Sequence, residues 1–170
     1  MNILLIGALF LVCLVKSIII VHKDEAMVIA RHGRYQKTLN AGLHFIFPFL
    51  DMPRAIALRE TVYDFPRRSV TTKDDIPIII DLLLYFQIVD AKSAVYEIAN
   101  LPEAVKKLTR ITLENFIGQL ELQETLVSRD KINNELKTIL NDAANKWGVK
   151  VNRVELINID KAESTLKERF

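Results

Sequence analysis

Hydrophobic and polar positions divide the chain into three stretches with different patterns. Residues 3–21 are almost continuously apolar, and Lys16 is the only charge among them. Residues 25–90 form short extended runs separated by turn residues. Residues 91–147 space their apolar side chains three and four positions apart, which is typical of amphipathic helices. The pattern therefore predicts an apolar N-terminal segment followed by one domain of strands and helices.

The apolar stretch is long enough to cross a membrane. Nineteen helical residues at about 1.5 Å each span roughly 28 Å, close to the hydrocarbon thickness of a bilayer. No Lys or Arg precedes the run and no small-x-small cleavage site follows it, which favours an uncleaved anchor over a signal peptide. The predicted anchor residues are Ile3, Leu4, Leu5, Ile6, Leu9, Phe10, Leu11, Val12, Leu14, Val15, Ile18, Ile19, Ile20 and Val21.

The charges around the anchor predict its orientation. Lys16 lies toward the C-terminal end of the run, from where its amine can reach the interface. A segment that dips into one leaflet is the alternative. Basic residues follow the run, at Lys23, Arg31, Arg34 and Lys37, and none precedes it. The positive-inside rule then predicts a single-pass membrane protein whose domain is cytoplasmic.

Short extended segments come next. Residues 26–30 and residues 56–65 are predicted strands, and Pro66 is expected to close the second. Lys73-Asp74-Asp75 predicts a hairpin turn.

The clearest strand runs from Ile76 to Val89. Its even positions are all apolar, and its odd positions mix apolar and polar side chains. Because successive side chains point to opposite faces, the even positions form the core face. The odd face is more apolar than a solvated face usually is, which indicates cover by the same chain, the favoured interpretation, or by another subunit. Ile79, Leu83 and Tyr85 are therefore the candidate self-association residues.

Three helices and a closing strand complete the domain. Helices are predicted over residues 91–98, from Pro102 onward, and from Thr125 or Ser128 to Gly148. Residues 149–159 are the predicted strand. Helical spacing predicts inward stripes of Val105, Leu108, Thr112, Phe116, Ile117 and Leu120, and of Ile132, Leu136, Ile139, Leu140, Ala143 and Trp147.

Charge and cysteine content exclude several classes of function. The formal net charge is +2, and no Lys/Arg-rich run is present, which argues against a nucleic-acid-binding protein. Cys13 is the only cysteine, so neither an intramolecular disulfide nor a cysteine-based metal site can form. Its position in the apolar run indicates a small buried hydrophobe, with palmitoylation as the alternative.

The sequence also lacks the motifs of catalysis. His22, His32 and His44 do not have the spacing of metal ligands, and no phosphate-binding glycine loop or nucleophile elbow occurs. The acidic pairs at residues 24–25 and 74–75 stand beside turn signals, where solvated turn residues are expected. We therefore expect a protein that is not an enzyme and binds no cofactor or metal.

Several short motifs occur in a characteristic order. They are residues 25–34 ending in His-Gly-Arg, 42–51 (Gly-Leu-His-Phe-Ile-Phe-Pro-Phe-Leu-Asp), 58–60 (Leu-Arg-Glu), 71–74 (Thr-Thr-Lys-Asp), Asp81 with Tyr85, 118–120 (Gly-Gln-Leu), 129–133 (Arg-Asp-Lys-Ile-Asn) and 147–151 (Trp-Gly-Val-Lys-Val). Together they resemble the stomatin/prohibitin (band 7, SPFH) family, closest to its stomatin-like and paraslipin-type members. Ala41-Gly42 stands where that family usually has Pro-Gly, and the sequence ends at Phe170, before the long charged helix of such proteins. A shortened member or a truncated product is therefore expected.

The resemblance implies an α+β fold, mainly an antiparallel sheet with packed helices, preceded by one N-terminal transmembrane helix. The expected organisation is an anchor over residues 1–22, an SPFH/band 7 domain over 23–160 and a short charged C-terminal segment over 161–170. The implied function is a non-catalytic, membrane-anchored scaffold that self-associates and organises or regulates membrane proteins, in protein quality control or membrane microdomains. The expected partners are membrane lipid, further copies of the chain, and a membrane-bound protease or channel. The alternatives are a monomeric membrane-tethered binding module for such a partner and a membrane-tethered hydrolase.

Overall fold

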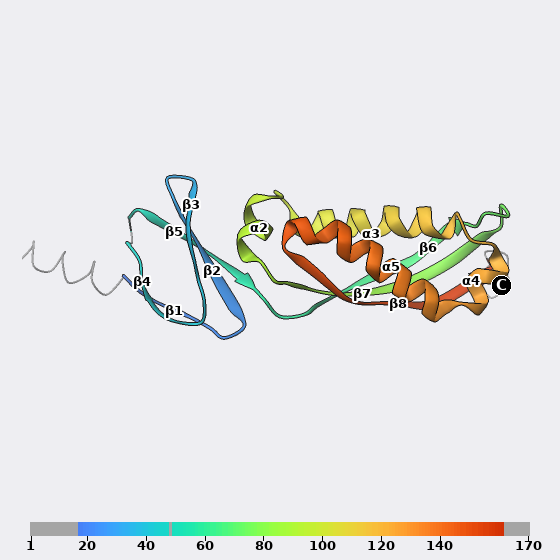
Figure 1. Ribbon diagram of the computed structural model, residues 1–170, viewed down its shortest axis with the longest axis horizontal. Coiled ribbons are helices and arrows are strands. Elements are labelled where there is room, and N and C mark those ends of the chain that lie inside the picture. The colour runs from blue at the N-terminus through green and yellow to red at the C-terminus, as the bar shows by residue number, and fades with distance from the viewer. Residues whose placement is uncertain (1–16, 48, 162–170) are drawn as a thin grey trace, which may run out of the picture.

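The computed structural model describes residues 17–47 and 49–161 of the chain. The molecule is elongated, with a small all-β part at one end and a larger part of sheet and helices at the other (Figure 1). Its described sheets are antiparallel and several helices accompany them, which confirms the predicted α+β class.

Five strands build the small part. They are β1 (Ile18–Val21), β2 (Glu25–Arg31), β3 (Arg34–Leu39), β4 (Gly42–Phe45) and β5 (Asp51–Ala57). β1 pairs with β4, and β2 lies between β3 and β5. His32 and Gly33, both at positive φ (50° and 76°), join β2 to β3 as a two-residue hairpin loop, a geometry that glycine accepts readily. Val21, Ile29, Leu39 and Ile46 form the core of this part.

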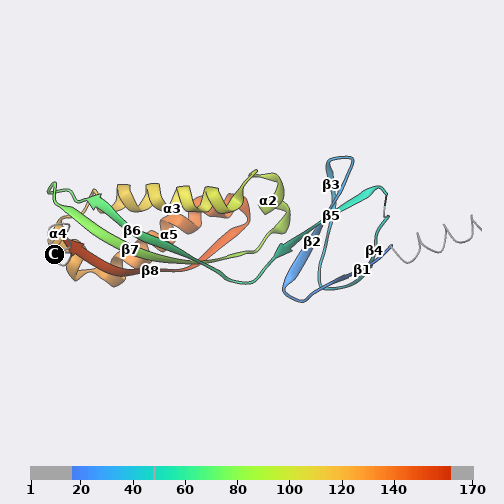
Figure 2. The same ribbon diagram turned by 180° about the vertical axis from the view of Figure 1, so that it is seen from behind.

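The larger part is a three-stranded sheet covered by helices on one face. The strands are β6 (Thr61–Thr71), β7 (Pro77–Ile88) and β8 (Val149–Lys161), with β7 in the middle. The helices are α2 (Ala91–Tyr96), α3 (Leu101–Ile117), α4 (Leu122–Val127) and α5 (Arg129–Ala144), followed by the 3-10 helix η1 (Asn145–Trp147). Figures 1 and 2 show α3 and α5 lying on the same side of the sheet.

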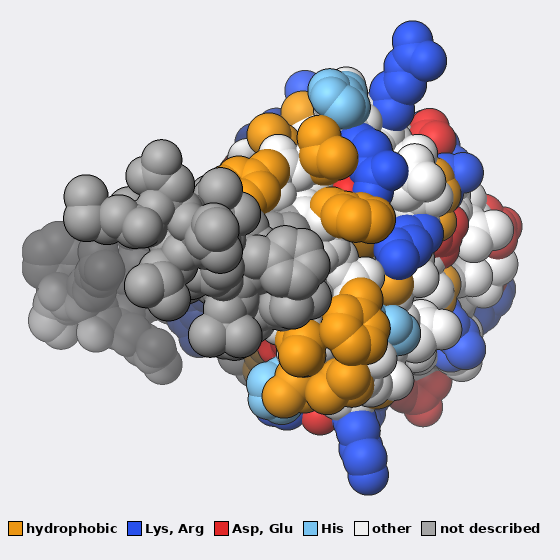
Figure 3. Space-filling model, turned by 90° about the vertical axis from the view of Figure 1, so that its left-hand side faces the viewer, with side chains coloured by type: hydrophobic (Ala, Val, Ile, Leu, Met, Phe, Trp, Pro, Cys, Tyr) orange, Lys and Arg blue, Asp and Glu red, His pale blue; other side chains and the backbone are white. Residues whose placement is uncertain are grey.

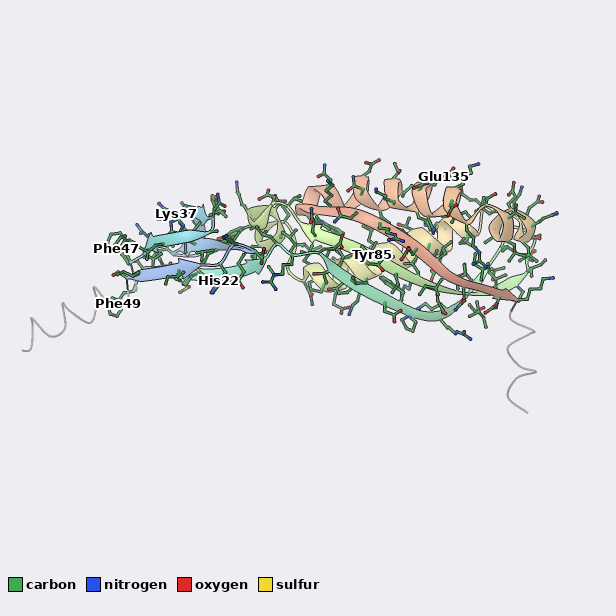
Figure 4. All side chains as sticks on the ribbon, turned by 90° about the horizontal axis from the view of Figure 1, so that it is seen from below. His22, Lys37, Phe47, Phe49, Tyr85 and Glu135 are labelled. Carbon is green, nitrogen blue, oxygen red and sulfur yellow. The ribbon has the colours of Figure 1, made fainter. Side chains whose placement is uncertain are left out.

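The alternation predicted for the central strand is confirmed. The even positions Ile78, Ile80, Leu82, Leu84 and Phe86 are buried against the helices, and the odd positions from Ile79 to Gln87 are half-buried. Among the described residues no helix packs on this odd face, which turns outward (Figure 4). None of the described helices therefore supplies the favoured cover from the same chain. Cover by another subunit stays a prediction.

The anchor prediction needs a correction at its C-terminal end. Ile18–Val21, expected in the transmembrane helix, form β1 and pair with Gly42–Phe45 of β4. The folded part thus extends at least to Ile18, before the expected start at residue 23. The remaining predicted anchor residues, from Ile3 to Val15, lie outside the described residues, as do residues 162–170 of the C-terminal segment.

The strand prediction for residues 56–65 is also wrong in its bounds. This stretch contains the end of β5 and the start of β6, and β6 continues through Pro66 to Thr71. The register of β6 against β7 shifts between Phe65 and Arg68, and a proline is tolerated at such a bulge in an edge strand.

The helical stripes are partly out of phase. The buried line of α3 is Leu101, Val105, Thr109, Leu113 and Ile117, whereas Leu108 and Phe116 only flank it. On α5, Ile132, Leu136 and Leu140 are buried as predicted, but Ile139 is exposed. Of the two starts expected for the third helix, Ser128 is confirmed as the residue before α5, whereas Thr125 lies in the separate short helix α4. Gly148, at φ 68°, ends η1 as expected.

Candidate membrane-contact site

Exposed apolar side chains gather at one end of the small part, which we call the apolar end. Phe45, Phe47 and Phe49 are 65%, 62% and 84% exposed. The other exposed members are Ile18, Ile20, Leu43, Leu50 and Met52. Phe47 and Phe49 lie at one extremity of the described part of the molecule (Figure 4), and several hydrophobic side chains gather on this end when it is viewed end-on (Figure 3). Clustered exposure of this kind marks an interaction surface.

The pairing of β1 with β4 explains part of this exposure. Ile18 stands opposite Phe45 and Ile20 opposite Leu43, so these four side chains share one face of the two-stranded sheet. That face is open, whereas Ile19 and Val21 point to the core on the other side. The small part thus presents one apolar face inward and a second one outward.

Asp51 holds the segment that carries Phe47 and Phe49. Its side chain is only 2% exposed, and Arg31 Nε donates to Oδ1 at 2.8 Å. The backbone N–H of Phe47 donates to Oδ2 at 2.9 Å, and the N–H of Asp51 donates to the carbonyl of Phe47 at 2.9 Å. The Arg31 guanidinium also lies 5.3 Å from the centroid of the Phe47 ring. These contacts keep the apolar groups turned outward.

The ion pair keeps Asp51 charged. The hydrogen bond from Arg31 lowers the pKa of the Asp51 carboxyl, and the N–H of Phe47 and the charge of Lys37 act in the same direction. In return, the hydrogen bond to Asp51 raises the pKa of Arg31. Burial opposes both effects without overcoming them.

Basic side chains follow directly behind the apolar end. Arg34 is opposite Arg31 in the β2–β3 pair, and Lys37 is opposite Ile29. Arg54 is opposite Val28 in the β2–β5 pair. In Figure 3, Lys and Arg side chains stand between and around the apolar groups. An apolar surface with a basic surround matches the layering of a membrane interface, where acyl chains meet phosphate groups.

Of the apolar residues predicted to form the anchor, only the last four, Ile18–Val21, lie within the described part of the chain. Ile18–Val21 belong to the apolar end or to the core beneath it. Within residues 17–47 and 49–161, none of the helices combines the length and apolarity needed to span a bilayer. Sequence reasoning missed the Phe47–Phe49 projection, although the alternating Phe45, Phe47 and Phe49 before an acidic residue were an available signal.

The three candidate self-association residues lie together on the odd face of β7, which we call the outer sheet face. Leu83 stands between Asp64 and Glu155 of the neighbouring strands, and Ile79 between Ser69 and Asp160. The guanidinium of Arg153 lies 5.6 Å from the centroid of the Tyr85 ring.

Asp81 divides that apolar row. Arg67 Nε lies 3.3 Å and Asn158 Nδ2 3.1 Å from its Oδ2, while its buried Oδ1 accepts a hydrogen bond from no described residue. The outer sheet face is therefore a half-buried apolar row interrupted by one carboxylate and bordered by charges.

The acidic pairs have structural roles. Asp74 accepts from the N–H of Leu122 at the start of α4, with both carboxylate oxygens within 3.4 Å of that nitrogen. The hydrogen bond with Thr72 lowers the pKa of Asp74. Asp24 pairs with Arg59 at 2.8 Å. The expectation of a solvated turn residue is confirmed for Asp74, which is exposed in the turn, and its carboxylate also joins the β6–β7 turn to α4.

The structure gives no indication of a metal site at the histidines that it describes. His44 Nε2 is 2.8 Å from the carbonyl oxygen of Asn40, within hydrogen-bonding distance. Among the described residues no group of three or more His, Cys, Asp or Glu side chains could hold a metal ion.

Comparisons with known proteins identify relatives over most of the chain. Residues 19–169 match the model of the SPFH domain / Band 7 family. An uncharacterized protein of Methanothermobacter thermautotrophicus is 39% identical over 157 residues, which are 92% of this chain and 49% of that protein. A stomatin homolog of Pyrococcus horikoshii is 36% identical over 150 residues, 88% of this chain and 56% of that protein. A protein of Methanocaldococcus jannaschii is 36% identical over 94% of this chain and 80% of its own length.

The chain spans about half the length of the first two of these relatives. Its matched region includes every strand and helix of the described structure except the first residue of β1. The resemblance inferred from the motifs is confirmed, and the chain belongs to the SPFH domain / Band 7 family.

Proposed function

We propose that this chain is a non-catalytic, membrane-bound scaffold that stands with its apolar end in the membrane interface and associates with further copies of itself. In that role it organises or regulates membrane proteins. Its family membership and its similarity to stomatin homologs support a membrane-associated scaffold.

The observation that carries the proposal is the exposure of the apolar end. A fully buried phenylalanine contributes roughly 1.5–3 kcal/mol relative to an exposed one, so three exposed phenylalanines represent a substantial driving force for leaving water. The apolar residues 3–15 precede β1 directly, and β1 begins at this end (Figure 1). An anchor there brings the apolar end to the bilayer.

The roles of the acidic residues favour a scaffold over the hydrolase alternative. Asp74 holds the start of α4 and Asp24 pairs with Arg59, so each of these carboxylates has a structural partner. The monomeric binding module differs from the scaffold only in self-association, through the outer sheet face.

Depth-dependent fluorescence quenching tests the contact between the apolar end and lipid. The full chain carries Trp147→Phe and Phe49→Trp and is reconstituted in vesicles that contain phospholipids brominated at defined acyl positions. We expect strong quenching by bromine near the headgroup end of the acyl chain, because Phe49 is the most exposed side chain of the apolar end.

The matched control places the tryptophan at the opposite end of the molecule. Val127 on α4 is 79% exposed, and a Val127→Trp, Trp147→Phe chain should not be quenched. Equal quenching of both tryptophans, or quenching of neither, would show that the apolar end does not face the bilayer.

A further inference from the structure

A groove lies between the edge strand β6 and helix α3, outside the apolar end and the outer sheet face. It has a volume of about 550 Å³. Figure 2 shows α3 running along β6. The groove is lined by Tyr63, Phe65 and Arg68 of β6 and by Glu103, Lys107 and Arg110 of α3, among others.

The two edge strands of the larger sheet differ in how their free backbone groups are covered. On β8, the side chains of α5 satisfy backbone donors: Asn141 Oδ1 accepts from the N–H of Val151 at 3.1 Å, and Asn133 Oδ1 from the N–H of Leu156 at 3.0 Å. β6 pairs with β7 and with no other described strand. Helix α5 thus covers the β8 edge, whereas the β6 edge borders the groove.

The groove has an excess of positive charge. Four of its side chains are cationic and two are acidic. Lys106 Nζ forms an ion pair with Glu103 at 3.3 Å, and Arg110 Nε lies 4.0 Å from Glu114 Oε1. Arg68 and Lys107 make no ion pair with any described residue. Asp64 is the one lining carboxylate that makes no ion pair with a described residue. Two unpaired cations on facing elements therefore leave a net positive charge, which favours an anionic ligand.

The groove also offers aromatic surface beside these cations. Tyr63 and Phe65 are half-buried in its floor, and Lys106 Nζ lies 5.4 Å from the centroid of the Tyr63 ring. A ligand with both acidic and apolar side chains would therefore satisfy the two kinds of surface. This combination fits a peptide better than it fits a small inorganic anion.

Pro66 limits how long a strand can pair with this edge. It has no N–H group, and the bulge between Phe65 and Arg68 interrupts the regular spacing of β6. A long strand, such as the edge of a second copy, cannot pair continuously there. A short extended segment held by its side chains can.

We propose that the β6–α3 groove binds a short, extended, acidic segment of a partner protein, with Arg68 and Lys107 receiving its carboxylates and Tyr63 and Phe65 its apolar side chains. The scaffold then has a recognition site for its clients that is separate from its membrane contact. This inference does not depend on the contact between the apolar end and lipid.

Selection from a random octapeptide phage library tests the proposal. The target is the full chain in nanodiscs of zwitterionic phosphatidylcholine, after removal of phage that bind empty nanodiscs. We expect the selected peptides to be enriched in Asp and Glu. Fluorescence anisotropy of a selected peptide should show at least a tenfold loss of affinity for the Arg68→Glu, Lys107→Glu chain, and weaker binding at high salt.

A chain with Lys131→Glu and Lys137→Glu is the matched control, because it has the same change of charge on the exposed side of α5. It should bind the peptide as the unaltered chain does. Since Arg68 and Lys107 are exposed, the groove variant should keep the unaltered melting temperature.

The proposal is wrong if the selected peptides are not acidic, or if both variants lose affinity equally. It is also wrong if the groove variant changes only the size of the assembly in the bilayer, because the groove would then hold a second copy.

Discussion

Asp51 shows how one residue can set the shape of a surface that it does not itself belong to. Its carboxylate lies beneath the apolar end, pairs with Arg31 and accepts the N–H of Phe47. Without the two carboxylate oxygens, the guanidinium and the N–H group would each lose a partner, and the outward position of Phe47 would no longer be enforced.

Replacing Asp51 with asparagine should lower the free energy of unfolding by about 1–2 kcal/mol at neutral pH. The expected loss of stability is small for a buried ion pair because Arg31 is 31% exposed, so that solvent screens its attraction to Asp51. Urea denaturation of the full chain in detergent measures it. Asp142→Asn on the exposed side of α5 is the control and should change stability by less than about 0.5 kcal/mol.

The same variant should alter the response to acid. Because the pKa of Asp51 is lowered in the folded state, its contribution is present above the ordinary aspartate value near 4 and is lost as pH falls through the folded-state pKa. The difference in stability between the unaltered chain and Asp51→Asn should therefore shrink below about pH 4. A difference that stays constant down to pH 2 contradicts this role.

At the scale of elements, Gly148 joins the end of η1 to the start of β8 and also touches α2. Its carbonyl accepts from the N–H groups of Val89 and Asp90, at 2.8 and 3.1 Å. A Cβ at this position would lie 2.3 Å from the carbonyl oxygen of Asp90, and the backbone has φ +68°. Asp90 in turn caps α2, accepting from the N–H of Lys92 at 3.0 Å.

Gly148→Ala should therefore destabilise the domain by about 2–3 kcal/mol, through left-handed strain and the clash with Asp90. Gly33→Ala is the matched control, because its φ is +76° and a Cβ there meets nothing within 4 Å. It should cost about 1 kcal/mol, the backbone strain alone. Equal losses in thermal or urea unfolding would mean that the contact with Asp90 relaxes without cost.

The sequence predicted those elements whose pattern is local and unambiguous. The alternation in Ile76–Val89 gave the central strand and its buried face, and Gly148 marked the end of the last helix. The phase of α3 was missed because Thr109 is buried, which its hydroxyl permits by donating to the carbonyl of Val105 at 2.9 Å.

Two boundaries could not be read from local pattern. The start of β1 lies inside a continuous apolar run, and only its pairing with Gly42–Phe45 distinguishes strand from anchor. Pro66 is normally a strand terminator, but the bulge in β6 accommodates it. The candidate site was missed for a related reason, since the exposure of Phe47 and Phe49 depends on the tertiary contact between Arg31 and Asp51.

At the scale of the whole molecule, the apolar end and the end of β8 lie at opposite extremities (Figure 1). Copies that stand on one membrane with the same end toward it are related by rotation about the membrane normal. They therefore meet along their long sides. The outer sheet face forms one such side and is the only face of the β6–β7–β8 sheet that no described helix covers.

Leu83→Glu should reduce assembly because it places a charge in the middle of this face, between Asp64 and Glu155. Those two acidic neighbours make a new carboxylate costly to bury against a second copy. We expect the fraction of crosslinked oligomers to fall several-fold when native membranes are treated with a lysine-reactive crosslinker, while the melting temperature of the domain changes little. Ile139→Glu on α5, at a position that is 43% exposed, is the control and should leave crosslinking unchanged.

The variant Tyr85→Lys tests whether the outer sheet face contacts a second copy or stabilises the single chain. Because Tyr85 lies beside Arg153, a lysine there adds repulsion to any copy packed on the face without removing a buried hydrophobic side chain. If both variants stay folded and still crosslink like the unaltered chain, the outer sheet face is not the contact and the monomeric module is the better description. If both unfold, the half-buried row serves the stability of the single chain, and self-association must use another side of the molecule.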